Sequence, residues 1–368
     1  MKKINIAHVV LKGDLTGGPG YSLIEIIENL PKDKFNNIIL THSLGELTTK
    51  LKELDSKVLF IKRNEISKIN PFPFFYTILK AVYYLKKEKI DISHFQFHTY
   101  RDPVLIATQI TGIKSIIHFR SPCSNIAKWW LNLANCFIFN SNFSREKSNL
   151  STEQQEKSYV LYNSINIEKF TQVKFDRNKI IDEYNLDPNF KYITCVSRVH
   201  PAKKIEYVIE VANVLRDQIN IKFLIVGAIQ DKNYYKFLTD LIDSYKLQNN
   251  IIFLEHIAKI QKIYCITDIL IHTAFEEPFG RIFLEASSFK IPVIAFDSGG
   301  VSEVLDRNAC FLVEYGNINE FSSSLKKLLN SKDLANKISE NSYNVINNNF
   351  SSKININKLI NIYKSLLK

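Results

Sequence analysis

The sequence is poor in cysteine and has no long apolar run. Its five cysteines lie far apart along 368 residues and form neither the close pairs of a metal site nor a disulfide framework. We therefore expect buried thiols in a reducing compartment. No stretch approaches the ~20 consecutive apolar residues that a membrane-spanning helix needs. Lys12 and Asp14 interrupt the apolar run near residue 4, so we interpret that run as a first strand and not as a signal peptide.

Common motifs for binding nucleotides and their metals are missing as well. There is no Asp-x-Asp, the carboxylate pair expected where a divalent cation neutralises a diphosphate, and this absence predicts that no metal takes part. Residues 16–20 (Thr-Gly-Gly-Pro-Gly) follow the first predicted strand, a position that often faces phosphate groups. They match neither Gly-x-Gly-x-x-Gly nor a P-loop, so Gly17 and Gly18 remain a weak anion-binding signal.

The net formal charge of +11 permits a nucleic acid, an anionic membrane or an anionic small substrate as partner. The lysines, however, are spread along the whole chain and accompany a surplus of Asn and Ile. Much of the charge is therefore also compatible with solvated surfaces that bind nothing.

Short runs of β-branched and aromatic residues recur along the chain, each bounded by turn signals. In the first half the predicted strands are residues 4–11, 38–42, 58–61, 92–97, 115–119, 136–139 and 159–162. Segments of helical periodicity, such as 21–30, 74–87 and 104–110, alternate with them. The pattern starts again after residue 170, with strands at 192–196, 223–226, 251–254, 269–271, 292–296 and 311–313. This alternation predicts parallel sheets covered by helices.

The repeated pattern predicts an α/β protein with two doubly wound domains, because 368 residues are too many for one ordinary core. We place the domains at residues 1–168 and 169–349. The sequence is helical from residue 317 almost to its end, and we expect the last helix, about 350–368, to pack back on the first domain. Ligands of open parallel sheets bind beyond the carboxyl ends of the strands, and two facing sheets form a cleft. Functional residues are therefore expected directly after strands.

The most specific cluster of such residues runs from His272 to Glu285. A strand ends at residue 271, a loop with proline and glycine follows, and a helix is predicted to begin near Gly280. Glu277 lies in the loop and Glu285 lies one to two turns into the helix. The backbone N–H groups at a helix start favour an anion or sugar hydroxyl oxygens, and carboxylates accept hydrogen bonds from hydroxyl groups. A helix with two solvated glutamates is the alternative that this segment alone leaves open.

Two further clusters follow strands of the second half. Arg198 and Lys203 lie at a strand-to-helix turn, where they could clamp a diphosphate, arginine with a fork of donors and lysine as a point charge. Gly299 and Gly300 follow the strand 292–296 and would let the backbone approach a ligand closely. Each cluster also has an ordinary interpretation, as solvated basic residues and as a simple turn.

In the first half, His98 and His118 each close a predicted strand and are expected to face the cleft. A structural histidine is the alternative for each of them.

In their order along the chain, these pieces resemble family 4 of the retaining glycosyltransferases, which have the GT-B fold of two Rossmann-like domains. The resemblance spans nearly the whole chain. The matching segments are Gly17-Gly18, His118, Asn140-Ser141, residues 162–166, Arg198 with Lys203, the paired glutamates Glu277 and Glu285, and residues 299–303. The sequence departs from the family pattern at Lys204, where the family usually has glycine, at Ser164 and at residues 288–290. These departures affect turns and not the charged residues.

The resemblance implies roles for individual residues. Arg198 and Lys203 would hold the donor diphosphate, and Glu285 would bind the nucleotide ribose. Glu277 and the backbone of residues 279–281 would position the transferred sugar, with His118 near its reacting end. The predicted catalytic residues are thus Glu277, His118, Arg198 and Lys203. The predicted donor site as a whole consists of Gly17, Gly18, Arg198, Lys203, Glu277, Phe279, Gly280, Arg281, Glu285 and Gly300.

The resemblance also implies the reaction. The expected enzyme is a hexosyl- or N-acetylhexosaminyltransferase that needs neither metal nor cofactor and forms an α-linkage with retention. Its donor would be a nucleotide sugar, with UDP expected rather than GDP, and its acceptor a glycan or a lipid-linked sugar. The expected setting is bacterial surface polysaccharide synthesis (lipopolysaccharide, O-antigen or capsule), in the cytoplasm or at the cytoplasmic face of the membrane.

A membrane role has its own sequence signal. Residues 72–76 (Phe-Pro-Phe-Phe-Tyr) lead into a helix with several lysines and tyrosines, and Trp129-Trp130 lies in a later helix of the same domain. Helices that combine basic and aromatic residues can lie at an anionic bilayer surface. However, Phe75, Leu79, Val82 and Leu85 also suit a plain core stripe, and both interpretations stay open.

Two other functions remain as alternatives. A nucleotide-sugar epimerase of the same fold would not transfer to an acceptor, and the paired glutamates with Arg198 and Lys203 favour transfer over epimerisation. A non-enzymatic nucleic-acid-binding protein is disfavoured because no recognised module is present and the charge is not concentrated in one stripe. We therefore expect no nucleic-acid partner.

Overall fold

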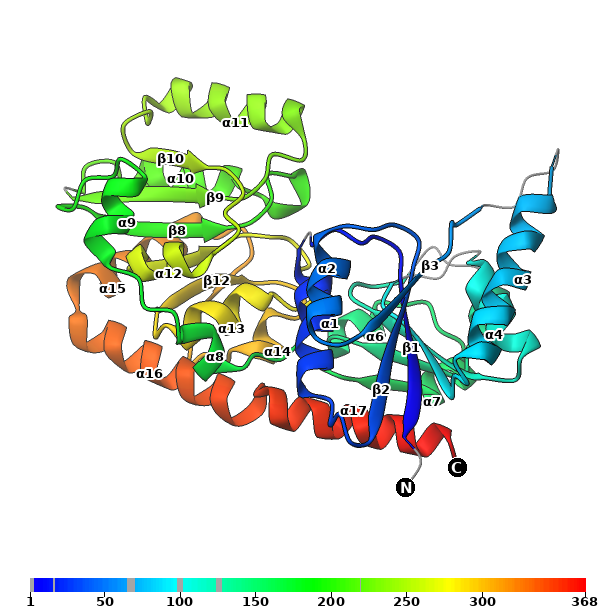
Figure 1. The fold of residues 1–368 in the computed structure, drawn as a ribbon. Helices are drawn as coiled ribbons and strands as arrows, with labels where there is room; N and C mark the ends of the chain where they lie inside the picture. The colour runs from blue at the N-terminus through cyan, green and yellow to red at the C-terminus, as the bar shows by residue number, and fades with distance from the viewer. Residues whose placement is uncertain (1–2, 16, 65–69, 98–101, 124–127, 219) are drawn as a thin grey trace. The chain divides into compact units, whose positions relative to one another are not determined.

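The two repeats of the strand–helix pattern form two separate parallel sheets in the computed structural model (Figure 1). The structure describes residues 3–15, 17–64, 70–97, 102–123, 128–218 and 220–368. Thr16 and His98 lie outside the described residues, as does the side chain of Trp129. The first unit contains Met1–Ser164 and Ser352–Lys368, and the second contains Ile165–Ser351.

Unit 1 contains a seven-stranded sheet with the order β3-β2-β1-β4-β5-β6-β7, in which all pairs are parallel. Its strands are β1 (Ile4–Val10), β2 (Phe35–Thr41), β3 (Lys57–Phe60), β4 (Ile92–Phe95), β5 (Lys114–Phe119), β6 (Cys136–Phe139) and β7 (Ser158–Val160). Its helices are α1 (Gly18–Asn29), α2 (Glu46–Glu53), α3 (Phe72–Lys87), α4 (Pro103–Ile110), α5 (Lys128–Leu131), α6 (Asn142–Glu146), α7 (Thr152–Glu156) and α17 (Ser352–Leu366). The winding reverses between β1 and β4.

Both faces of this sheet are buried, which explains why its strands are apolar on both sides. Ile6 of β1 packs with α1 and α17 in one core. Its neighbours Ala7 and Val9 pack in the other core with α3 and α4. Since successive side chains of a strand point to opposite faces, α17 covers the face on which even-numbered residues of β1 lie. The C-terminal helix therefore packs on the first domain, as predicted.

Helix α3 has apolar residues on both of its faces. Phe74, Ile78, Ala81 and Leu85 are buried in the core that α3 shares with α4. Phe75 and Leu79 are 54% and 69% exposed. The alternative interpretation, in which they belong to a core stripe, is therefore wrong. Periodicity could not distinguish the faces, because each presents an apolar stripe. Among the described residues, no helix is both long and apolar enough to cross a bilayer.

Unit 2 contains a six-stranded sheet with the order β10-β9-β8-β11-β12-β13, again parallel throughout. Its strands are β8 (Lys191–Val196), β9 (Ile221–Val226), β10 (Ile251–Leu254), β11 (Ile269–His272), β12 (Val293–Asp297) and β13 (Phe311–Glu314). Its helices are α8 (Ile167–Thr171), α9 (Arg177–Glu183), α10 (Glu206–Val214), α11 (Lys232–Tyr245), α12 (Gln261–Ile266), α13 (Arg281–Ser288), α14 (Val301–Val304), α15 (Ile318–Asn330) and α16 (Lys332–Asn349), with a short 3-10 helix at Pro201–Lys203.

Unit 2 also buries both faces of its sheet. Helices α10, α11 and α15 cover one core, and α9 and α12 cover the other. The chain enters the unit at Ile165, whose N–H donates to the carbonyl oxygen of Phe350, and α8 then packs against α13. The unit therefore begins at Ile165, a few residues before the predicted boundary. The predicted class of two doubly wound Rossmann-like domains is confirmed.

Candidate active site

The strand order of unit 2 marks where a ligand would bind. The chain leaves β8 toward β9 on one side and later returns to β11 on the other side, so the winding reverses beside β8. In open parallel sheets, helices diverge at such a switch point and leave a crevice at the carboxyl ends of the strands. The loops after β8, β11 and β12 meet there, and they carry most of the side chains predicted from the sequence.

Lys203 and Glu277 form the centre of this region. The Lys203 Nζ atom lies 2.6 Å from Glu277 Oε2, and the two side chains are 19% and 11% exposed. His272, the last residue of β11, places its Nε2 atom 3.4 Å from the same carboxylate oxygen. Strand β8 and strand β11 are neighbours, so residues separated by more than seventy positions are brought together by the sheet.

These partners keep Glu277 ionised. Burial alone would raise the pKa of its carboxyl group, but the charge of Lys203 and the nearby imidazole of His272 outweigh burial. The pKa of Glu277 is therefore held well below its ordinary value. A permanently charged carboxylate in a mostly buried place can accept strong hydrogen bonds from hydroxyl groups or balance a cation.

The glycine pair after β12 fixes the backbone of Glu277. Gly300 donates its N–H to the carbonyl oxygen of Glu277 at 2.7 Å. Gly299 has a φ of 75°, and a Cβ atom there would lie 2.4 Å from the same carbonyl oxygen. Gly300 was predicted to contact a ligand directly. In this structure its N–H group is already hydrogen-bonded to Glu277 and is not available for that contact. The glycine pair holds the loop that carries Glu277.

A second charged cluster lies at the start of α13. Gly280 precedes the helix with a φ of 80°, and a Cβ atom there would collide with the Phe283 ring at 2.3 Å. Arg281 Nε then donates to Glu285 Oε1 at 3.0 Å, one turn along the helix. Tyr264 of α12 donates its hydroxyl to Glu285 Oε2 at 2.9 Å. The predicted helix start near Gly280 is confirmed. Arg281 and Tyr264 each bind one of the two carboxylate oxygens of Glu285 and fix its side chain.

Glu285 differs from Glu277 in its electrostatics. Burial raises the pKa of Glu285, and Arg281 and Tyr264 offset only part of this effect. The pKa of Tyr264 is also raised well above its ordinary value, by burial and by the adjacent carboxylate. The two glutamates of the signature are thus not equivalent: each is paired with a cation, but the partners of Glu277 outweigh the effect of burial on its pKa and those of Glu285 do not.

Arg198 is solvent-exposed and donates from Nη1 to Gln230 Oε1 at 2.8 Å. It lies on the same loop as Lys203 but has a different partner. Lys204, where the family pattern has glycine, adopts a left-handed φ of 52°, and Lys290 does so with a φ of 55°. At both positions the residue is lysine, but the backbone still adopts the left-handed conformation that favours glycine.

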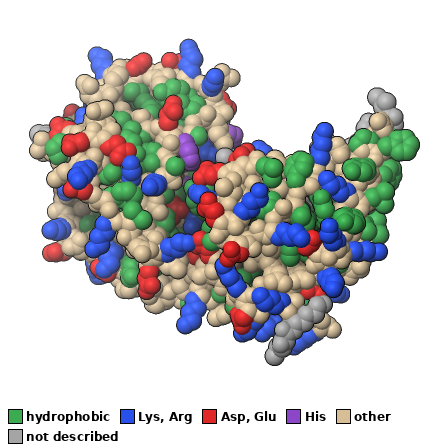
Figure 2. Space-filling model, viewed as in Figure 1, with side chains coloured by type: hydrophobic (Ala, Val, Ile, Leu, Met, Phe, Trp, Pro, Cys, Tyr) green, Lys and Arg blue, Asp and Glu red, His purple; other side chains and the backbone are tan. Residues whose placement is uncertain are grey.

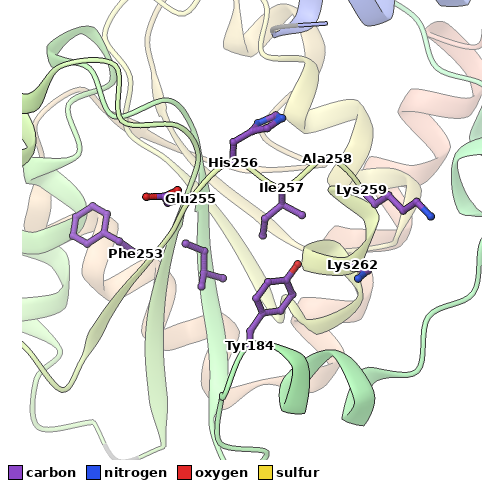
Figure 3. A pocket seen from close by; sticks show the side chains of 9 residues that line it. Tyr184, Phe253, Glu255, His256, Ile257, Ala258, Lys259 and Lys262 are labelled. Carbon is purple, nitrogen blue, oxygen red and sulfur yellow. The ribbon is translucent and has the colours of Figure 1, made fainter. Parts of the chain in front are cut away.

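A cavity of about 590 Å³ lies at the carboxyl end of β10 in the same unit. Glu255 and His256 follow β10, and Tyr184 and Lys262 come from α9 and α12 or their ends. Figure 3 shows Tyr184 and Ile257 near the centre of the cavity, with Lys259 extending away from them. Its volume is in the range of small-molecule sites. These residues were not predicted from the sequence, although the position of Glu255 and His256 directly after β10 was an available signal.

Most of the remaining predicted residues belong to unit 1. Gly17 precedes α1 with a φ of 74°, and a Cβ atom at Gly18 would meet no heavy atom within 4 Å. His118 lies on β5 and is fully buried within unit 1. Its place near the transferred sugar stays a prediction. Burial lowers its pKa well below the ordinary value, with Arg120 adding to the effect. Phe279 of unit 2 is also buried, with its ring against Phe350, so only its backbone could contact a ligand.

The sequence analysis also missed the partners of the predicted residues. Tyr264 and Gln230 had no motif to reveal them, since Tyr264 is positioned by packing and Gln230 is exposed and held by the hydrogen bond from its N–H to the carbonyl oxygen of Val199. No group of three or more His, Cys, Asp or Glu that could hold a metal ion is found among the described residues. Metal independence stays a prediction.

The geometry above is that of an α/β protein with a charged loop cluster at the switch point of unit 2, and comparisons with known proteins identify its class. The family model described as "Glycosyl transferases group 1" matches residues 176–345. The chain is 28% identical to the capsular polysaccharide biosynthesis glycosyltransferase CapM of Staphylococcus aureus, over 60% of this chain and 58% of that protein. It is also 28% identical to the UDP-Gal:alpha-D-GlcNAc-diphosphoundecaprenol alpha-1,3-galactosyltransferase of Escherichia coli, over 98% of this chain and 97% of that one.

A solved structure gives the same result over the whole length. The glycosyltransferase of Rickettsia africae ESF-5 superposes with a TM-score of 0.87 and 26% identity, covering 100% of both chains. The protein is therefore a glycosyltransferase. It has the GT-B fold and resembles the group 1 glycosyltransferases, whose family model matches its second unit.

Proposed function

We propose that the protein is a retaining, metal-independent glycosyltransferase that moves a sugar from a UDP-sugar to a lipid-linked or glycan acceptor with α-linkage. The observation that carries this proposal is the convergence of Lys203, Glu277 and His272 with the Arg281–Glu285 pair at the switch point of unit 2. A nucleotide diphosphate needs cations, and a sugar or ribose needs hydrogen-bond acceptors. The site supplies both within one loop cluster.

The charges in this site suit a diphosphate leaving group. As the sugar leaves, negative charge develops on the diphosphate, and fixed cations stabilise it. The Lys203 ammonium group has three donors and can bind a phosphate oxygen while it keeps its bond to Glu277. Arg198 is exposed on the same loop and could turn from Gln230 to a second phosphate oxygen. We assign Glu277 to the transferred sugar and Glu285 to the ribose.

The relatives support the choice of donor and setting. The name of the Escherichia coli relative contains UDP-Gal as donor and a diphosphoundecaprenol-linked sugar as acceptor, and the Staphylococcus aureus relative is named for capsular polysaccharide biosynthesis. We extend these to a UDP-sugar donor, a lipid-linked acceptor and bacterial surface polysaccharide synthesis on the cytoplasmic side of the membrane.

The donor proposal is tested by thermal shift with UDP, GDP and ADP at equal concentration, because a ligand that binds only the folded state raises its apparent stability. UDP should give the largest shift. Transfer from UDP-sugars to an undecaprenyl-diphosphate-linked sugar is then measured with and without EDTA, and product anomeric configuration is read by NMR. Activity that disappears with EDTA and returns with Mg²⁺ would contradict metal independence, and a β-linked product would contradict retention.

The same assay separates the competing functions. An epimerase converts the donor sugar without any acceptor and releases no free UDP, whereas a transferase releases UDP in proportion to the glycosylated acceptor. A gel-shift assay tests nucleic-acid binding, which we expect to be absent.

We further propose that unit 1 binds an anionic membrane through α3. Phe72, Phe75, Tyr76, Leu79 and Tyr83 are all at least 54% exposed on this helix and recur at helical spacing. Lys80 and Lys87 lie over the rings of Tyr84 and Tyr83 at 5.8 and 5.3 Å. Figure 2 shows hydrophobic and basic side chains gathered at the place where Figure 1 draws α3. Aromatic side chains with adjacent lysines suit the interface of an anionic bilayer.

This surface is tested by flotation with vesicles of phosphatidylglycerol or of phosphatidylcholine alone. The protein should float with the anionic vesicles at low salt, and the double variant Phe75→Ser, Leu79→Ser should not. Phe237→Ser, at a similarly exposed apolar residue of unit 2, is the matched control and should float like the unchanged protein. No flotation of the unchanged protein at low salt would end the idea.

A further inference from the structure

Three histidines lie on one face of the unit 1 sheet, beneath α17. His8, His94 and His118 belong to the adjacent strands β1, β4 and β5, and each is 0% exposed. Their strand neighbours Ile6, Ile92 and Ile116 pack in the core that contains α17. Three imidazoles in one apolar core require specific partners, because buried polar groups without hydrogen bonds destabilise a fold.

Two of these histidines form a chain of hydrogen bonds that starts on α17. The Tyr363 hydroxyl lies 2.7 Å from His94 Nδ1. His94 Nε2 lies 3.3 Å from His118 Nδ1. The two imidazole rings are nearly parallel, 4° apart with centroids separated by 5.4 Å, which suits a hydrogen bond in the plane of the rings. His118 Nε2, at the far end of this chain, is buried without a hydrogen-bond partner among the described residues.

The donor and acceptor of each of these two hydrogen bonds can be assigned from the groups at the two ends of the hydrogen-bond network. Each bond can run in either direction, and the two directions differ in which donor is left without an acceptor. If His94 donated to Tyr363, the tyrosine hydroxyl proton would lack an acceptor, since the described part of the chain gives that hydroxyl no other partner. This donor would stay unpaired inside the core whether or not a substrate is bound. The short distance of 2.7 Å also suits an O–H donor better than an N–H donor.

We propose that Tyr363 and His94 are positioning residues that fix His118 in the tautomer with its proton on Nε2, so that His118 donates a hydrogen bond to an oxygen atom of the substrate. Tyr363 donates to His94 Nδ1, and His94 Nε2–H donates to His118 Nδ1. The unpaired donor is then His118 Nε2–H, which a substrate oxygen can satisfy. This inference rests on the proposed glycosyl transfer, with His118 acting as a donor and not as a general base.

The tautomer is measured directly by ¹⁵N-correlated NMR of the histidine rings at pH 7.5, with His94 and His118 assigned from single variants. In the unchanged protein, both rings should carry their proton on Nε2. Tyr363→Phe removes the hydroxyl that directs His94, so a mixture of tautomers should appear at both rings. A proton on Nδ1 of His118 in the unchanged protein would overturn the proposal. This readout needs no enzymatic activity, so it stands or fails independently of the proposed function.

Transfer kinetics provide the second readout. Tyr363→Phe should lower kcat by about threefold to tenfold and leave the affinity for UDP unchanged. Tyr192→Phe is the matched control, since Tyr192 is equally buried and its hydroxyl donates at 2.7 Å to the carbonyl oxygen of Asp187 in unit 2. The control should keep full kcat at a similar loss of melting temperature. Equal losses of kcat in both variants would reduce Tyr363 to a structural role and overturn the proposal.

The role of His118 as donor is tested with two amide replacements. His118→Gln can place an amide N–H near the position of Nε2, whereas His118→Asn places its amide near that of Nδ1. Gln should retain at least tenfold more kcat than Asn. If His118 is instead the base that removes a proton, neither amide can replace it, and equally inactive variants would contradict a donor role.

Discussion

The two units have the same order of strands at the centre of their sheets. They differ in the polar side chains that lie near these strands, which are charged in unit 2 and neutral in unit 1. Unit 2 buries charged pairs beside its switch point, Lys203 with Glu277 and Arg281 with Glu285. Unit 1 buries neutral imidazoles at the corresponding strands, and burial lowers the pKa of His8 to about 4. The backbone topology is the same, so the difference lies entirely in the side chains.

Under the proposed function, this difference corresponds to different roles of the two units. A diphosphate brings negative charge into a partly dry place, and the cation of Lys203, held in position by Glu277, can meet it without reorganisation. Neutral imidazoles cannot balance such a charge, but they can orient an uncharged sugar by hydrogen bonds. Under the proposed function, we therefore assign donor affinity to unit 2 and the geometry of transfer to unit 1. The predictions below test that division.

The largest effect is expected in unit 2 from Glu277→Gln. This variant keeps the size of the side chain but removes the charge that pairs with Lys203, so kcat/KM should fall by about a thousandfold. The free energy of unfolding should fall by about 2 kcal/mol, less than for a fully buried pair because Lys203 is partly exposed. Steady-state transfer kinetics and chemical denaturation measure the two quantities.

The matched control for Glu277→Gln is Glu340→Gln. Glu340 pairs with Lys290 at 2.7 Å in the same unit, but both side chains are about half exposed. Such surface pairs contribute little, so activity and stability should stay near those of the unchanged protein. Full activity of Glu277→Gln would show that unit 2 does not supply the decisive charge.

A smaller effect concerns the neutral histidines of unit 1. His8 has a folded pKa of about 4 because of burial, against 6.5 when unfolded. Below pH 6.5 the unfolded chain therefore binds more protons than the folded one, and stability is lost as pH falls from 6.5 to 4. Between pH 6.5 and 5 this single group should cost about 1.5 kcal/mol. Glu285 of unit 2 has a raised pKa and the opposite sign, so it favours the folded state as pH falls.

Hydrogen exchange of β1 amides at pH 6.5 and 5, corrected for intrinsic rates, measures this loss in unit 1 alone. His8→Gln keeps a hydrogen-bonding group toward Asn37, which His8 contacts at 3.0 Å, but cannot titrate. The variant should lose less protection than the unchanged protein over this range, by the 1.5 kcal/mol that is expected of His8 alone. An identical pH dependence in both proteins would mean that His8 does not titrate as its burial requires.

Features that depend on short sequence patterns could be predicted. Every strand could be predicted from an apolar run rich in β-branched or aromatic residues, and the proximity of Lys203 and Glu277 could be predicted because loops that follow parallel strands meet at one edge. Glu285 could be placed on the helix that begins near Gly280. Partners set by packing could not be predicted. His94 and Tyr363 are 269 positions apart and meet only because α17 returns to unit 1. No local period relates such residues.

Helix α3 illustrates a second limit. Its two apolar stripes have the same helical period, so the sequence could not decide which one packs against α4. In the structure, Phe74 and Ile78 pack into the core of unit 1, and Phe75 and Leu79 therefore remain on the solvent-exposed face of the helix. A pattern of residue types shows that a helix has an apolar face, but the neighbouring elements determine whether that face is buried.

The smallest effect, and the sharpest test of the division between units, compares two tyrosines. Tyr264→Phe removes the hydroxyl that donates to Glu285 at 2.9 Å while Arg281 remains in place. A hydrogen bond to a charged group contributes about 1.5 kcal/mol, so the Kd for UDP should rise about tenfold, with kcat little changed. Isothermal titration calorimetry measures the Kd. Tyr363→Phe in unit 1 should do the reverse, lowering kcat without changing the Kd. If both variants change the same parameter, donor affinity and transfer geometry are not divided between the units.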